Sequence, residues 1–73
     1  MTAQDIGQAA GSLWARLSDM PDGATLSALK KTPGIRSEEA VAAVGWLARE
    51  GKLRFEADGR KTIITLARVP VSV

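Results

Sequence analysis

The first eighteen positions of the chain carry apolar residues in a helical pattern. They recur at spacings of three and four residues and share one helix face: Ile6, Ala9, Ala10, Leu13, Trp14 and Leu17. Thr2, with Asp5 three residues later, resembles a capping box and predicts the helix start. Pro21 and the Asp22-Gly23 turn pair predict an end near residues 18–23. We therefore expect a first helix with Trp14 in the core.

A short strand and a short second helix are expected next. Residues Ala24 to Leu26 suit a brief strand, and Ser27 is the predicted N-cap of a helix that runs through Lys31. The Pro33-Gly34 pair closes this helix. Ile35 is expected to supply an apolar contact in the connection that follows.

The third expected helix is capped by Ser37 and ends before Gly51, a predicted left-handed C-cap. Acidic residues in its first turn suit the positive end of the helix dipole. On a helical wheel, its core face holds Ala40, Val41, Val44, Leu47 and Ala48. Its outward face holds Glu38, Glu39, Ala42, Trp46, Arg49 and Glu50.

After Gly51 the apolar period changes to two, which predicts a β-hairpin with Asp58-Gly59 as its two-residue loop. This loop pairs Glu56 with Lys61, as an exposed ion pair, and Leu53 with Ile64. One face of the hairpin then holds Leu53, Phe55, Ile64 and Leu66. The other face holds Arg54, Glu56, Lys61, Ile63 and Thr65.

The order helix, short strand, helix, helix, hairpin is that of a winged helix-turn-helix domain, of class α+β. We expect three helices with a C-terminal β-hairpin wing and a short extra strand, over residues 1–68. Residues 69–73 are assigned to a C-terminal tail, where Pro70 argues against a central strand.

Composition limits the chemistry that this domain can perform. The chain has 73 residues with no cysteine and no histidine, which excludes disulfides, thiolate metal sites and imidazole catalysis. No spacing of serine, lysine or acidic residues indicates an active site, so we expect a protein that is not an enzyme and has no cofactor. Neither a signal peptide nor a membrane span is indicated, and a cytoplasmic protein is expected. Its oligomeric state is left between monomer and weak homodimer, with Ile63 or residues 69–73 as candidate contacts.

Three segments resemble a small bacterial and archaeal family of winged helix-turn-helix proteins: LSALKK, AVGWLAREGKL and EADGRKTIITL. The resemblance covers nearly the whole chain, and the GWLARE string is its most specific part. It implies the winged fold and a nominal DNA-binding role, without catalytic residues.

The positive charge is concentrated in the second part of the chain. Residues 1–29 hold one base against three acids, whereas residues 30–73 hold nine bases against five acids. The third helix suits base reading poorly, because its first turn carries Glu38 and Glu39 and its outward face has no Asn or Gln. Double-stranded DNA is therefore expected to be held weakly by cations of the wing and of the helix ends: Arg36, Arg49, Arg54, Arg60 and Lys61. A solvated wing is the other interpretation of these cations.

Trp46 supports an alternative function. An outward tryptophan beside Ala42 and Ala43, with Arg49 at the rim, has the composition of a protein-contact site. The sequence leaves a second interpretation open, in which the indole folds over the helix and covers the wing or the first helix. The alternative function is thus a protein-interaction module with Ala42, Trp46 and Arg49 as contacts.

Overall fold

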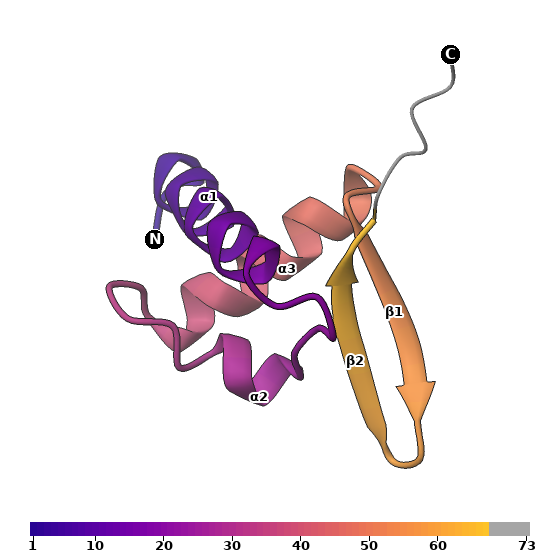
Figure 1. Ribbon diagram of the computed structural model, residues 1–73. Coiled ribbons are helices and arrows are strands. Elements are labelled where there is room, and N and C mark those ends of the chain that lie inside the picture. Colours follow the sequence, from indigo (N-terminus) through magenta and orange to yellow (C-terminus); the bar gives the residue numbers. More distant parts are fainter. Residues whose placement is uncertain (68–73) are drawn as a thin grey trace.

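The computed structural model describes residues 1–67 and has three helices followed by one antiparallel hairpin. The helices are α1 (Ala3–Ser18), α2 (Leu26–Leu29) and α3 (Ser37–Arg49), and the strands are β1 (Leu53–Asp58) and β2 (Lys61–Leu66). Figure 1 shows the helices packed together and the hairpin extending beyond them. This arrangement confirms the predicted α+β class with a wing. The predicted domain end at residue 68 and the tail of residues 69–73 lie outside the described residues.

The capping box predicted for α1 is present. The Asp5 backbone N–H donates to the Thr2 hydroxyl at 3.1 Å, and the Thr2 backbone N–H donates to the Asp5 carboxylate at 2.9 Å. Two backbone donors at the helix start, which lack partners inside the helix, are thereby satisfied. The helix then runs to Ser18, as the Pro21 and Gly23 signals predict.

The same contact predicts a pH dependence of stability. The donating Thr2 backbone N–H, with the Thr2 hydroxyl, holds the pKa of Asp5 below its ordinary value. A lowered folded-state pKa stabilises the fold above the unfolded-state pKa, and this stabilisation is lost as the pH falls through the folded-state pKa. We expect Asp5→Asn to lower the melting temperature at neutral pH, and the difference from the natural chain to vanish at about pH 2. Thermal unfolding followed by circular dichroism checks this, and a difference that persists in acid would contradict it.

The start of α2 differs from the prediction. Thr25, not Ser27, is the N-cap, and its hydroxyl accepts from the Ala28 backbone N–H at 3.2 Å. The helix ends at Leu29 rather than Lys31. The extra strand is reduced to one bridge between Ala24 and Ile64, because the next residue already caps the helix.

The two ends of α3 were predicted with different success. Arg36 is the N-cap and Ser37 the first helical residue, so the predicted Ser37 cap is wrong. The hydrogen bond at this helix start comes from Glu39, whose carboxylate accepts from the Arg36 backbone N–H at 2.9 Å. At the other end, Gly51 has the predicted left-handed conformation, with φ of +72°. The Gly51 N–H donates to the Ala48 carbonyl at 3.0 Å, and the Lys52 N–H donates to the Leu47 carbonyl at 2.9 Å. These two bonds form a Schellman motif.

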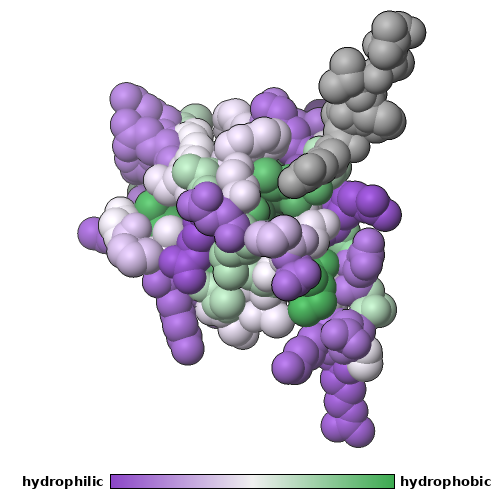
Figure 2. All heavy atoms as spheres, in the orientation of Figure 1, coloured by the Kyte–Doolittle hydropathy of each residue, from purple (hydrophilic) through white to green (hydrophobic). Residues whose placement is uncertain are grey.

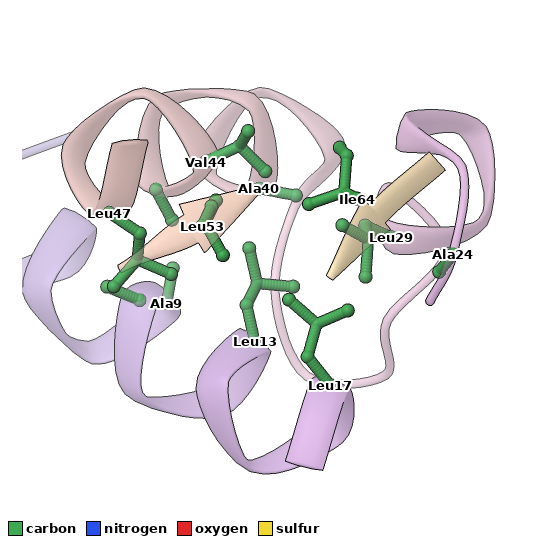
Figure 3. Packing of buried hydrophobic residues seen from close by; sticks show 12 residues of the cluster. Ala9, Leu13, Leu17, Ala24, Leu29, Ala40, Val44, Leu47, Leu53 and Ile64 are labelled. Carbon is green, nitrogen blue, oxygen red and sulfur yellow. The ribbon is translucent and has the colours of Figure 1, made fainter. Parts of the chain in front are cut away.

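The core lies where α1 crosses α3 and the hairpin closes over both, as Figure 3 shows around Leu13. Ile35 packs against this core from the connection, as predicted. The buried residues of the core are Ala9, Ala10, Leu13, Leu17, Ala24, Leu29, Ala40, Ala43, Val44, Leu47, Leu53 and Ile64.

Two predicted core residues are wrong, and one was missed. Trp14 is 40% exposed and Val41 45% exposed, whereas Ala43 is fully buried and Ala48 only half-buried. The reason is that alanines fill the contact between α1 and α3, so the helices approach closely and leave no room for an indole. The buried face of α3 is consequently turned toward α1, away from Val41.

The hairpin register is displaced from the prediction. Leu53 pairs with Leu66 and Asp58 with Lys61, which leaves Gly59 and Arg60 as the loop. Only Gly59 has a positive φ there, +65°, as in a type II′ turn with glycine first. A type I′ turn on Asp58-Gly59 requires a positive φ at Asp58 as well, which that residue does not adopt.

This displacement keeps every residue on its predicted face but changes its partners. Phe55 lies opposite Ile64 on the inner face, yet it is 49% exposed because the hairpin extends past the helices. Glu56 lies opposite Ile63 rather than Lys61. The predicted ion pair with Lys61 is therefore wrong, and Glu56 instead pairs with Arg54 at 3.5 Å.

Candidate nucleic-acid interface

A groove of about 540 Å³ separates the start of α2 from the tip of the hairpin, and we call it the wing groove. One wall comes from α2 and its cap, and the other from the hairpin loop and the first residues of β2. The lining residues are Thr25, Leu26, Ser27, Arg60, Lys61 and Thr62. Figure 2 shows hydrophilic side chains gathered around the hairpin tip, at the lower end of the view.

The chemistry of the wing groove suits a phosphodiester. Arg60 and Lys61 are exposed cations, and among residues 1–67 no carboxylate belongs to the lining. The Thr25 hydroxyl accepts from a backbone N–H and so keeps its own proton free to donate into the groove. Ser27 and Thr62 add two further hydroxyls. Cations and hydroxyls are the groups by which proteins hold the nucleic-acid backbone.

Arg54 lies apart from these two cations. It lines a different groove of about 560 Å³ on the outer face of the hairpin, together with three carboxylates: Asp22, Glu56 and Asp58. Its guanidinium is already 3.5 Å from the Glu56 carboxylate. An excess of carboxylates disfavours a phosphate there, so the structure separates Arg54 from the pair at the hairpin tip.

The other two candidate cations lie at opposite ends of α3. Arg36 is its N-cap and Arg49 its last residue, so the length of the 13-residue helix, about 20 Å, separates them. Neither belongs to the wing groove. The exposed ridge between them carries Glu38, Val41 and Gly45, none of which offers the bidentate donors that read guanine or adenine.

Trp46 is 43% exposed, but its surroundings differ from the predicted patch. Ala43 is buried and Ala42 half-buried, and Arg49 does not belong to the groove that the indole lines. That groove, of about 220 Å³, lies between α1 and the end of α3, and we call it the tryptophan groove. It is lined by Gly7, Gly11, Trp14, Trp46, Glu50 and Lys52, among others.

The sequence contains a signal for this groove beside the apolar stripe that predicts the core face of α1. Gly7, Gly11 and Trp14 follow one another at spacings of four and three residues, which makes a second stripe beside the core stripe. Lys52 completes the site, because its ammonium lies 5.7 Å from the centre of the Trp14 ring and 3.7 Å from the Glu50 carboxylate.

Residues 1–67 lack the features of two other classes of site. This part of the chain brings together no group of three or more side chains able to hold a metal ion. None of its helices has the combination of length and apolar composition needed to cross a bilayer.

Comparisons with known proteins agree with this architecture. The family model described as winged helix-turn-helix domain (DUF2582) matches residues 1–66. The solution NMR structure of protein BT2368 from Bacteroides thetaiotaomicron is similar, with 32% sequence identity and a TM-score of 0.74 over 90% of this chain and 79% of that chain. No curated protein matches the sequence. The chain therefore belongs to the winged helix-turn-helix domain family DUF2582.

Proposed function

We propose that this domain binds double-stranded DNA weakly, through the phosphate backbone, in a role like that of a transcription regulator. The wing groove is the observation that carries this proposal, because, within the described part of the chain, two cations and three hydroxyls line it without a carboxylate. Winged helix-turn-helix domains are typically binding modules, which agrees with a role of this kind.

Specific base reading by α3 is not part of the proposal. Its first turn carries Glu38 and Glu39, and like charges facing phosphates are unfavourable. Its exposed ridge offers valine and glycine where a reading helix needs donors and acceptors. Affinity then comes from the backbone and depends strongly on salt.

The test removes the two cations of the wing groove. We expect Arg60→Ala with Lys61→Ala to weaken binding to a labelled duplex at least ten-fold at low salt. Because this variant neutralises two phosphates fewer, the slope of log affinity against log salt should become shallower by about 2. Fluorescence anisotropy at several salt concentrations measures both quantities.

A charge-matched control is available in the same chain. Arg49→Ala with Arg54→Ala removes two cations that lie outside the wing groove, so this variant should lose less than about three-fold at the same salt. Equal losses in the two double variants would mean diffuse attraction rather than a site. A natural chain without affinity for duplex DNA would refute the proposal altogether.

The exposure of Trp46 supports a second candidate, a protein-interaction module. A half-exposed tryptophan is the residue type that most often dominates a protein contact. Trp46→Ala separates the two functions, because it should leave the anisotropy titration unchanged while abolishing binding of a protein partner. Loss of DNA binding in this variant would instead place the nucleic acid at the tryptophan groove.

A further inference from the structure

Both tryptophans of the chain leave much of their apolar surface exposed in the tryptophan groove. Trp14 is 40% exposed and Trp46 43% exposed, and both line the same groove. An aromatic side chain contributes most when its whole apolar surface leaves water. A surface that approaches this groove closely would cover both indoles at once.

Two glycines of α1 in this groove make no packing contact within residues 1–67 that would require glycine. Neither Gly7 nor Gly11 has a positive φ, and a Cβ atom added at either position would meet nothing within 4 Å. Glycine is among the poorest helix formers. Neither the packing nor the backbone geometry of residues 1–67 explains why glycine stands at these two helical positions. Bare backbone at a helix surface does, however, allow another chain to approach closely.

We propose that the tryptophan groove is the contact between two copies of this chain. Trp14 lies seven residues after Gly7, two helical turns further on the same side of α1, about 10 Å away. When a two-fold axis passes between Gly7 and Trp14 and the two α1 helices run antiparallel, the Trp14 indole of each copy lies on Gly7 of the other copy. One surface then carries both the projecting indole of Trp14 and the hollow at Gly7 that receives it, as a self-complementary interface requires. This inference goes beyond the proposed DNA binding and does not depend on it.

The charges of the groove lining permit a second copy to approach. Glu50 and Lys52 are the charged residues of the groove lining, and they pair with each other at 3.7 Å. The lining is thus neutral, so two copies can face each other here without repulsion, although the whole chain carries +2. An acidic or basic partner, in contrast, would find no unpaired counter-charge among the described residues that line the groove.

The contact that the outer faces of two α1 helices can make is small. α1 has 16 residues, so it is about 24 Å long and about 10 Å wide, and its outer face offers roughly 240 Å². Stable complexes bury about 800 Å² on each partner. The dimer is therefore weak and forms only at high protein concentration.

Sedimentation equilibrium of the natural chain up to about 1 mM tests this, together with matched glycine variants. Gly7→Ala with Gly11→Ala adds two methyl groups inside the groove, and we expect dimerisation to weaken at least ten-fold. Gly45→Ala is the control, because Gly45 also has open space around it but lies outside the groove. This control should dimerise like the natural chain.

Three results would overturn the proposal. The first is a chain that stays monomeric over the whole concentration range. The second is a dimer that the double glycine variant leaves unchanged, since the contact would then lie elsewhere, for example at Ile63. The third comes from NMR: indole N–H signals of Trp14 and Trp46 that move on addition of duplex DNA, but not with protein concentration, would assign the groove to nucleic acid.

Discussion

Gly23→Ala should lower the free energy of unfolding by about 2–5 kcal/mol. Gly23 has a φ of +82°, where an alanine costs about 1–2 kcal/mol. Its Cβ would also lie 2.6 Å from the Ile64 carbonyl oxygen and 2.7 Å from the Ile63 Cγ2 atom. The Ile64 carbonyl cannot move away freely, because it accepts from the Ala24 N–H at 2.9 Å.

The size of this loss is large relative to the stability of such a domain. Folded proteins have about 0.05–0.15 kcal/mol of stability per residue, which gives roughly 4–11 kcal/mol for a chain of this length. Urea unfolding followed by tryptophan fluorescence would therefore show a much lower midpoint for Gly23→Ala, or no folded baseline.

Gly34→Ala is a matched control for the steric part of this loss. Gly34 has a nearly equal φ of +86°, but a Cβ there would meet nothing within 4 Å. Only the backbone cost of about 1–2 kcal/mol should appear. If both variants lose the same stability, the hairpin does not pack on Gly23 as the structure shows.

Gly23 also shows where sequence reasoning reaches its limit. The Asp22-Gly23 pair correctly predicts a turn, because that property depends on the residues of the turn alone. Nothing local indicates that residues 63–65 of the hairpin will lie against the glycine, about forty positions further along the chain. The same distinction separates the other successes from the failures.

Features governed by neighbouring residues were predictable. The capping box at Thr2 and the left-handed cap at Gly51 depend on contacts within five residues, and both are present. The order of helices and strands likewise follows from the change of apolar period at Gly51. These local signals were enough to predict the winged fold.

Features that depend on the distance between elements were not predictable. Trp14 is excluded from the core because α1 and α3 meet through alanines, and the sequence does not show which alanines will face each other. The hairpin register depends on the turn type, which Gly59 and Arg60 determine through their φ angles.

The candidate site was predictable only as a set of residue types. Cations were expected around the hairpin, but the sequence could not separate Arg60 and Lys61, which line the wing groove, from Arg54, which lines a different groove. The hydroxyls of Thr25 and Ser27 join the site because the Ala24–Ile64 bridge holds the start of α2 beside β2. These cations and hydroxyls come together only when the chain has folded.

Leu29→Ala should reduce the free energy of unfolding by about 2–5 kcal/mol, because a fully buried leucine leaves a cavity that its surroundings fill only in part. Leu29 is the one buried residue of α2, and Figure 3 shows it beside Ile64. A helix of four residues has little stability of its own, so this side chain largely determines its position.

Leu26→Ala is the control in the same helix, because Leu26 is 38% exposed and should lose only about 1 kcal/mol. Chemical unfolding of both variants measures the difference, and equal losses would contradict the burial of Leu29. The consequence reaches the wing groove, since Thr25 and Ser27 are positioned by α2. Leu29→Ala should therefore weaken DNA binding at temperatures where the rest of the domain is still folded.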